Sequence, residues 1–309
     1  MIARSVTPLL VVICLWGLGS RATEPVTAGA RPVAVLVPGF FSSLVFGYVR
    51  VTPEKLKVDI QPYFAINILR AFASQGVEPV VVDTLSPVGT LEDNGRRLIA
   101  FLDRLNSDAH FKGRPLHLIA HSAGGLYSLF AIAHRPDIGI QSLTTLSTPF
   151  HGAEFVDRLA TGVPGLESAV SYMNLQSLPQ MRPANVARFV SQFDLPKNFV
   201  IKVFAGEQSF YWDPTDARGL SWPMNITSLL IDRRSDGIVS VDSSYATGVL
   251  THTQGPLPIL KGTNTLPLEH WEQTLDYRVF TLLGIRNAAY IRDTQDRFYG
   301  SLAKSIIGR

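Results

Sequence analysis

The chain has 309 residues, of which 46% are hydrophobic and 17% charged, and its net charge at pH 7 is +3. This composition can bury a substantial core, which excludes an intrinsically disordered protein. Lys and Arg are scattered without a dense run, so nothing in the sequence supports nucleic-acid binding. The length allows one large domain or two small ones.

The first 22 residues have the composition of a secretory signal peptide. A start with a single Arg precedes an almost wholly apolar stretch at 9–18, and small residues at 20 and 22 suit a cleavage site. The apolar stretch is shorter than the roughly 20 residues of a membrane-spanning helix. We expect a secreted or periplasmic protein, with an uncleaved membrane anchor as the alternative. The single cysteine, Cys14, lies in this segment, so an exported chain would hold no disulfide.

From residue 31 onward, short apolar segments alternate with segments of helical periodicity. This alternation predicts an α/β fold, with a mostly parallel central sheet and helices on both faces. The predicted strands span 32–37, 79–82, 116–120, 142–147, 199–204 and 226–231, and the predicted helices span 60–75, 90–106, 123–134 and much of 273–309.

The strand signal disappears between about residues 155 and 196, where Ser, Gln, Asn, Pro and Leu are frequent. We interpret this stretch as a helical cap inserted over the carboxyl edge of the sheet. No repeat and no long linker divides the chain, so residues 31–309 are expected to form a single domain with this cap.

The segment Ala120-His121-Ser122-Ala123-Gly124 fits the nucleophile-elbow pattern G-x-S-x-G with Ala in the first position. A sharp strand-to-helix turn that holds a serine in strained geometry requires very small residues two places before and after it. A glycine-rich helix start is the alternative interpretation. The apolar strand before Ser122 and the predicted helix after it favour the elbow.

A serine nucleophile needs a general base, and the base needs an orienting acid. In strand–turn–helix scaffolds of this kind, the acid and then the base follow the serine along the chain. Asp236, in the turn Ser235-Asp236-Gly237, is the candidate acid, with Asp232 as its rival and an ordinary Asp-Gly turn as the alternative. His270, in the segment LPLEHWEQ, is the candidate base, and His252 is the second choice.

The oxyanion formed during attack on a carbonyl needs two backbone N–H donors. Ala123, directly after the serine, is one candidate. Phe40, in the loop after the first strand, is the other, because Gly39 lets the chain approach closely.

These segments, in this order, resemble the bacterial secreted true lipases, which are triacylglycerol lipases of the α/β-hydrolase fold. LHLIAHSAGGLYS resembles the family's strand–GHSxGG–helix block, and LTTLSTPFHGAEFVD is similar to its TxGTPHxGSxxAD segment. RRSDGIVSVDSS resembles the segment that carries the family's catalytic acid, and LEHWEQ the segment that carries its histidine. The resemblance covers about residues 32–277.

The resemblance implies hydrolysis of lipid acyl esters by Ser122, Asp236 and His270, with peripheral contact to a lipid interface. It implies a lipase-specific foldase as a partner and no organic cofactor. It also implies a structural calcium ion. The segment 212–217, WDPTDA, looks like the family's LDPSDA ligand segment and places Asp213 on the first ligand, while Glu272 and Asp276 take the places of the others. All three offer the oxygen donors that calcium requires.

The chain departs from the family pattern at three places. Pro38 replaces a histidine in the first oxyanion segment, Asp242 occupies a cysteine position, and the cap is reworked. A phospholipase, a short-chain carboxylesterase and an acyltransferase therefore remain alternatives on the same fold. Outside these, the alternatives are a catalytically silent lipid-binding relative and an anchored structural protein.

Overall fold

The computed structural model describes residues 31–40, 63–162, 177–196, 199–209, 222–231, 234–248, 250–252, 255–256, 259–276 and 288–308. The proposed signal peptide, Asp213 and Asp232 lie outside these residues.

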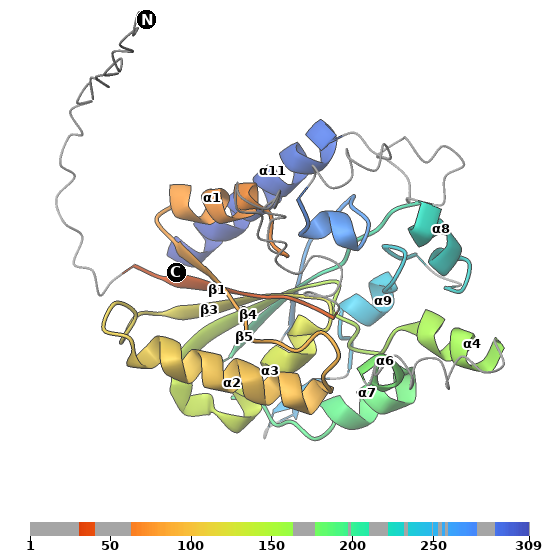
Figure 1. Cartoon of the computed structure of the whole chain (residues 1–309), viewed down its shortest axis with the longest axis horizontal. Helices are drawn as coiled ribbons and strands as arrows, with labels where there is room; N and C mark the ends of the chain where they lie inside the picture. Colours follow the sequence, from red (N-terminus) through yellow and green to blue (C-terminus); the bar gives the residue numbers. More distant parts are fainter. Residues whose placement is uncertain are drawn as a thin grey trace, which may run out of the picture.

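The centre of the protein is a six-stranded sheet with the order β2-β1-β3-β4-β5-β8, in which all neighbouring strands are parallel (Figure 1). It confirms the predicted α/β class. The chain adds β2 on one side of β1 and then β3 on the other side, so the strand order reverses between β1 and β3. The carboxyl ends of strands at such a reversal border a crevice where α/β proteins bind ligands. The strands are β1 (Val33–Val37), β2 (Glu78–Val81), β3 (Leu116–His121), β4 (Ile140–Leu146), β5 (Val200–Phe204) and β8 (Ile259–Lys261).

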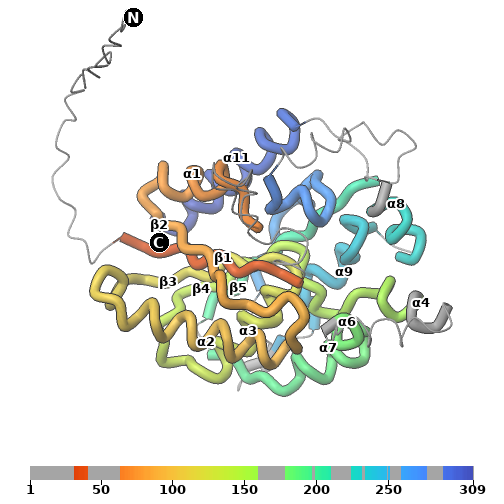
Figure 2. Tube along the Cα trace, in the orientation of Figure 1, coloured from red at the N-terminus to blue at the C-terminus, as the bar shows by residue number. Residues whose placement is uncertain are grey.

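Helices cover both faces of this sheet, as its buried strands require (Figures 1 and 2). On one face α1 (Ile66–Ser74) packs beside α11 (Ala288–Ile307), and their core contains Phe72 and Tyr299. On the other face α2 (Leu91–Ser107) packs against α3 (Gly124–His134). The sheet therefore separates two apolar cores. Among the described helices, none combines the length and the apolar character that crossing a bilayer demands.

Several short helices gather at the end of the sheet where the strands finish (Figure 1). Of the proposed cap, residues 163–176 lie outside the described part, and the rest forms α4, α6 and α7 with turns between and after them. Phe189 of α7 stacks near Phe130 of α3 at a ring-centroid distance of 6.4 Å, which ties α7 to the main core. The helices are α4 (Glu154–Gly162), α6 (Ser177–Gln180), α7 (Pro183–Val190), α8 (Trp222–Ser228) and α9 (Val241–Ser244).

Two sequence-based assignments of strands need correction. The strand predicted at 226–231 is wrong, because residues 222–228 form α8 and the apolar side chains of Ile226 and Leu229 are 53% and 68% exposed. The last strand of the sheet is instead β8, which was not predicted, since three residues are too few to show a periodicity. A small antiparallel pair, β6 (Thr251–His252) and β7 (Gly255–Pro256), precedes it.

A buried cation joins the amino ends of β2 and β3. The Arg114 side chain is 1% exposed, and its Nη1 donates to Glu78 Oε2 at 2.7 Å. His110 Nε2 lies 2.9 Å from the same carboxylate. Partial burial alone would raise the pKa of Glu78, but the hydrogen bonds from Arg114 and His110 outweigh it and lower this pKa. The contact therefore stabilises the fold when Glu78 is ionised.

We expect Glu78→Gln to lower the free energy of unfolding at neutral pH by about 1–3 kcal/mol, because Arg114 loses its anionic partner. Since the folded-state pKa of Glu78 is depressed, its contribution is complete above the ordinary value of 4.5 and is lost as the pH falls through the folded-state pKa. Denaturant unfolding of both proteins between pH 7 and pH 3 measures this. A difference that stays constant over that range would contradict the assignment.

Candidate active site

Ser122 occupies a strained turn between β3 and α3. Its φ is 54°, in the left-handed region that residues other than glycine rarely adopt. The Ser122 amide donates to Leu146 O of β4 at 2.9 Å, and Thr148 Oγ1 donates to Ser122 O at 2.8 Å. The surrounding structure therefore holds both backbone polar groups of the strained residue.

Glycines bring three segments into close contact around this turn. A Cβ on Gly124 would lie 2.5 Å from Val37 O, and one on Gly125 would lie 2.1 Å from Thr148 Oγ1. A Cβ on Gly39 would lie 2.6 Å from Ser122 Cβ. The small residues predicted for the elbow are thus required by packing as well as by backbone geometry.

Asp236 lies in a turn whose backbone surrounds its carboxylate. The amides of Ile238 and Val239 donate to Oδ1 at 3.0 and 2.8 Å, and Gln273 Nε2 donates to Oδ2 at 2.9 Å. Burial, which is complete for this side chain, would raise the pKa of Asp236, but the charge and hydrogen bond of His270 and the other donors outweigh it and lower the pKa. The site therefore keeps this buried acid ionised.

His270 joins Asp236 to Ser122. Its Nδ1 lies 2.8 Å from Asp236 Oδ2 and its Nε2 lies 3.0 Å from Ser122 Oγ. The His270 amide also donates to Asp236 O at 3.0 Å, so backbone and side chain fix the pair together. The exposed fractions of Ser122, Asp236 and His270 are 8%, 0% and 4%. The structure thus brings the three predicted residues into one hydrogen-bonded row in which His270 can accept a proton from Ser122.

The C-terminal helix α11 holds the His270 segment from behind. His270 precedes the 3-10 helix η3 (Trp271–Gln273), and Gln295 Nε2 donates to Glu272 O and Leu275 O at 2.8 and 2.9 Å. Tyr299 Oη donates to Gln273 O at 2.9 Å. Two side chains of α11 therefore satisfy three carbonyls of the turn that carries the histidine. This support depends on tertiary contacts and has no local pattern in the sequence.

Both candidate oxyanion donors lie beside the serine. Ala123 is buried and directly precedes α3, where backbone amides favour negative charge. Phe40 is half-buried and follows Gly39 in the loop after β1. The carbonyl of Pro38 would lie 2.7 Å from a Cβ on Gly124, so this loop packs against the start of α3.

A second histidine, His121, lies next to the row formed by Ser122, His270 and Asp236. His121 faces His270 with ring centroids 4.6 Å apart, and its Nδ1 lies 2.7 Å from Tyr63 Oη. Burial, and then the charge that His270 can carry, hold the pKa of His121 well below its usual value. The Tyr63 hydroxyl also lies against the oxyanion loop, 2.8 Å from the position of a Cβ on Gly39. Tyr63 and His121 therefore form a chain of contacts from the oxyanion loop at Gly39 to the imidazole ring of His270.

The structure describes only part of the other predicted site residues, namely the alternative base His252 and the proposed calcium ligands. His252 falls in β6, and its side chain is outside the described part. Glu272 and Asp276 are both buried and lie near His270 in the chain, and Glu272 Oε2 accepts the Glu269 amide at 3.2 Å. Among the described residues, no group of three or more His, Cys, Asp or Glu side chains could hold a metal ion. Asp213, the first of the three proposed calcium ligands, lies outside the described residues, so the calcium site stays a prediction.

No protein-family model matches the chain, and no curated protein matches it. Solved structures do resemble it. The mature form of a Bacillus licheniformis lipase superimposes with a TM-score of 0.54 at 18% identity, over 86% of this chain and 96% of the lipase. A Staphylococcus hyicus lipase gives 0.61 at 13% identity, over 92% of this chain and 97% of the other. A metagenomic carboxyl esterase gives 0.60 at 15%, over 93% and 80%. This likeness, together with the sheet, shows the α/β-hydrolase fold.

We expect Tyr63→Phe to slow the reaction of Ser122 with a fluorophosphonate about tenfold, because a small displacement of positioned groups is costly. The melting temperature should also fall, because the buried His121 Nδ1 loses its hydrogen-bond partner, at a cost of about 1–3 kcal/mol, so labelling is measured well below the melting temperature of each variant. Tyr127→Phe is the matched control: the Tyr127 hydroxyl is also buried and has no hydrogen-bond partner in the described part of the chain. Equal labelling rates for both variants would remove Tyr63 from the site.

Proposed function

We propose that the protein is a serine hydrolase that cleaves lipid acyl esters through an acyl-enzyme. The observation that carries the proposal is the hydrogen-bonded row from Asp236 through His270 to Ser122. A buried serine in a strained turn, within reach of an imidazole that a carboxylate orients, is the arrangement needed to activate a hydroxyl nucleophile.

In the proposed first step, Ser122 Oγ attacks the ester carbonyl while His270 Nε2 takes its proton. The imidazolium that forms is stabilised by Asp236, whose lowered pKa keeps it anionic. The N–H groups of Phe40 and Ala123 stabilise the oxyanion. His270 then gives the proton to the departing alcohol oxygen, and the acyl group remains on Ser122.

In the second step, water attacks the acyl-enzyme while His270 takes its proton, and His270 then returns that proton to Ser122 Oγ as the fatty acid leaves. His121 beside His270 suits both steps, because a neutral second imidazole does not repel the imidazolium. The chain's own residues thus supply the nucleophile, the base, the acid and the oxyanion donors.

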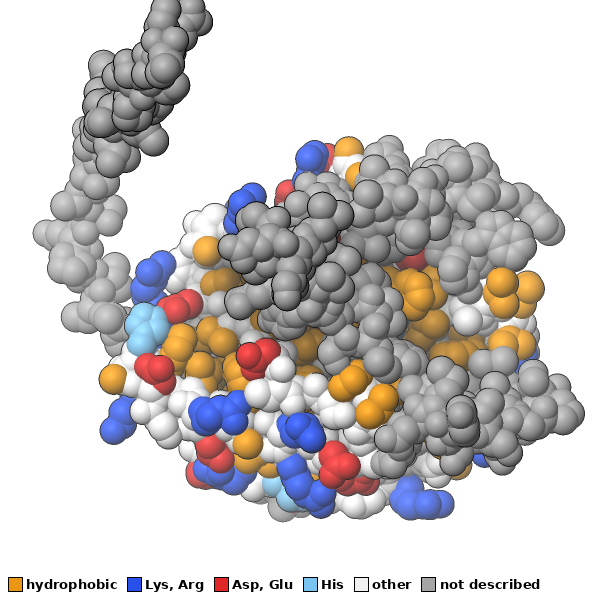
Figure 3. Space-filling model, in the orientation of Figure 1, with side chains coloured by type: hydrophobic (Ala, Val, Ile, Leu, Met, Phe, Trp, Pro, Cys, Tyr) orange, Lys and Arg blue, Asp and Glu red, His pale blue; other side chains and the backbone are white. Residues whose placement is uncertain are grey.

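An apolar acyl chain is the substrate group that the surroundings favour. Hydrophobic side chains are visible between the grey regions at the end of the molecule that carries α8, as they are elsewhere on this face (Figure 3). Ile226 of α8 and Leu229, directly after it, are exposed. Met224 of α8 packs on Gly237 beside Asp236, so this apolar surface adjoins the proposed active site. The structural neighbours are described as lipases and an esterase, which supports the same class.

The finer parts of the proposal follow the sequence resemblance. They are a triacylglycerol-lipase type of activity, export directed by residues 1–22 to the periplasm or the medium, and assistance by a lipase-specific foldase. Contact with a lipid interface would be peripheral.

We expect a fluorophosphonate to label the wild-type protein and not the Ser122→Ala variant. In the same comparison, only the wild-type protein should hydrolyse p-nitrophenyl esters, which are tested over a series of increasing acyl chain length. Labelling that survives the alanine substitution would contradict the assignment of the nucleophile. Labelling without turnover of any ester would favour an acyltransferase, and turnover restricted to short chains would favour a carboxylesterase. A phospholipid cleaved in preference to a triacylglycerol would favour a phospholipase.

The matched histidine variants test the base in the same assay. His270→Ala should lower kcat by at least about 10³-fold, since loss of a triad member removes most of the rate enhancement. His252→Ala should retain activity. The opposite result would overturn the role proposed for His270.

A structural calcium ion is a further part of the proposal. Asp213, Glu272 and Asp276 would supply its oxygen ligands, and the ion would tie the His270 segment to the segment around residue 213. Calcium that binds only the folded state raises its stability, so addition of a chelator should lower the melting temperature. The Asp213→Asn variant should then melt at the same temperature with and without the chelator. Identical melts of the wild type under both conditions would remove these residues from a metal site.

A further inference from the structure

A second strained serine directly follows β4, beside the turn of Ser122. The φ of Ser147 is 46°, in the left-handed region, and the residue is fully buried. Its two neighbours in the chain hold the nucleophile, because Leu146 O accepts the Ser122 amide and Thr148 Oγ1 donates to Ser122 O. These contacts do not involve the side chain of Ser147.

The strain at Ser147 indicates that its hydroxyl has a function. A left-handed conformation costs a residue with a side chain about 1–3 kcal/mol, whereas glycine adopts it readily. Glycine would therefore be the less strained residue at this position, and alanine would bear the same strain as serine. The hydroxyl is the only group that serine adds to alanine, so its contacts are what can offset the strain.

The hydroxyl of Ser147 lies beside the buried acid. The Gly206 amide donates to Ser147 Oγ at 3.0 Å. Gly206 in turn lies against Asp236, since a Cβ on Gly206 would lie 2.9 Å from Asp236 Cβ. The same Cβ would lie 2.1 Å from Gln273 Nε2, which donates to Asp236 Oδ2. The absence of a side chain at residue 206 therefore lets the end of β4 approach the acid.

The hydroxyl hydrogen of Ser147 has the Asp236 carboxylate as its partner. Because the Gly206 amide donates to Oγ, the O–H remains available as a donor. Burial would raise the pKa of Asp236, and Ser147 is one of the hydrogen-bond donors, after His270, that lower it. Ser147 and Asp236 are both fully buried, so bulk water does not compete for this bond. A hydrogen bond to an ionised group in such surroundings is stronger than one between neutral groups.

We propose that Ser147 is a positioning residue for the acid: its hydroxyl donates to the Asp236 carboxylate and keeps this anion directed at the imidazole. The effect on rate rests on the proposed hydrolysis, whereas the hydrogen bond itself is made without substrate. The end of β4 then holds both ends of the hydrogen-bonded row. The neighbours of Ser147 fix the backbone of Ser122, and Ser147 fixes Asp236.

The test compares Ser147→Gly and Ser147→Ala with the control Ser142→Ala. Glycine removes the hydroxyl and relieves the strain, while alanine removes the hydroxyl and keeps the strain. Ser142 lies near the amino end of the same strand, and its buried hydroxyl contacts His117 Nδ1 at 2.8 Å. The control therefore removes a buried, hydrogen-bonded hydroxyl of β4 away from the acid.

Two measurements follow the Asp236–His270 pair. The first is the rate at which a fluorophosphonate labels Ser122 as a function of pH. The second is the pH titration of the NMR resonance of the proton between His270 Nδ1 and Asp236 Oδ2, which is identified by its loss in His270→Ala. The second measurement needs neither a substrate nor turnover.

Without the Ser147 hydroxyl the Asp236 anion is less stabilised, so the Asp236–His270 pair holds its proton more tightly. We expect the acidic limb of the labelling profile and the midpoint of the resonance titration to move to higher pH by about one unit in both Ser147 variants. On that limb, labelling should be about tenfold slower than in the wild type. Ser142→Ala should keep the wild-type profile and titration.

A Ser147→Gly protein with the wild-type profile and titration would overturn the proposal, because glycine fits this backbone and only the hydroxyl is missing. Equal shifts in Ser147→Gly and Ser142→Ala would also overturn it, since they would show a general effect of losing a buried hydroxyl. A wild-type protein that neither reacts with the fluorophosphonate nor cleaves an ester would contradict the proposed function alone. The resonance titration would in that case still decide the role of Ser147.

Discussion

The left-handed backbone of Ser122 is the constraint on which the rest of the site depends. Such a conformation costs a residue with a side chain about 1–3 kcal/mol and persists only where its surroundings hold it. Here β4 accepts the Ser122 amide, and Thr148 donates to its carbonyl. Gly39 and Gly124 let neighbouring segments close on the turn. The cost is therefore met by the packing of three strands and by small residues placed where a Cβ would collide.

The geometry of the acid and the base follows from how their loops leave the sheet. The segment after β5 hydrogen-bonds on one side to the Asp236 turn, through Gln208 N and Ser235 O at 3.0 Å, and on the other to the chain before His270, through Glu207 N and Leu266 O at 2.9 Å. Residues distant in sequence thus meet because both loops pair with the same short stretch. Gly206 is part of this arrangement, since a Cβ there would lie 2.1 Å from Gln273 Nε2.

Features with strong local signals could be predicted from the sequence, namely the buried strands, the elbow at Ser122 and the order of acid and base. The structure confirms the parallel sheet and brings Ser122, Asp236 and His270 together; the calcium site, the signal peptide and the role of His252 stay predictions. Features that depend on tertiary contacts gave no local signal. α8 and the turn after it have apolar residues like a strand, yet Ile226 and Leu229 are exposed, because this segment lies at the surface. Tyr63 is recognisable only once the fold brings the segment before α1 beside His121.

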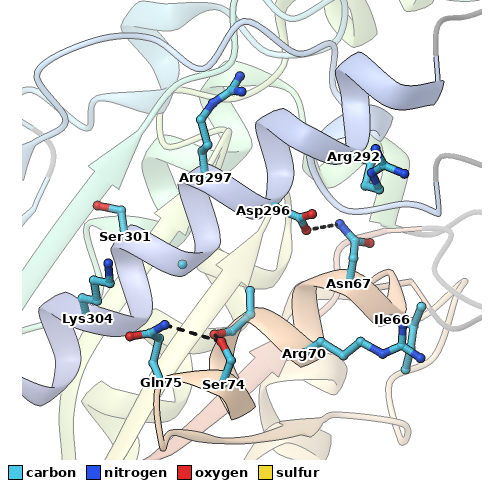
Figure 4. Close-up of a pocket in the computed structure, with 12 residues that line it drawn as sticks. Ile66, Asn67, Arg70, Ser74, Gln75, Arg292, Asp296, Arg297, Ser301 and Lys304 are labelled. Carbon is cyan, nitrogen blue, oxygen red and sulfur yellow. Dashed lines mark hydrogen bonds between the residues drawn. The ribbon is translucent and has the colours of Figure 1, made fainter.

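Helix α11 lies beside α1 (Figure 4) and links it to the turn that carries His270. The side-chain amide of Gln295 donates from Nε2 to Glu272 O and Leu275 O of that turn, and its Oε1 accepts a hydrogen bond from Asn67 of α1. Neither a carboxylate nor an ammonium group could make both kinds of bond, because an ionised carboxylate only accepts hydrogen bonds and an ammonium group only donates them. A side chain with both functions at this position ties the distance between α1 and α11 to the position of the His270 turn. The spacing of α1 and α11 and the placement of the His270 turn therefore share the Gln295 contact, beside the ring contact between Phe72 and Tyr299.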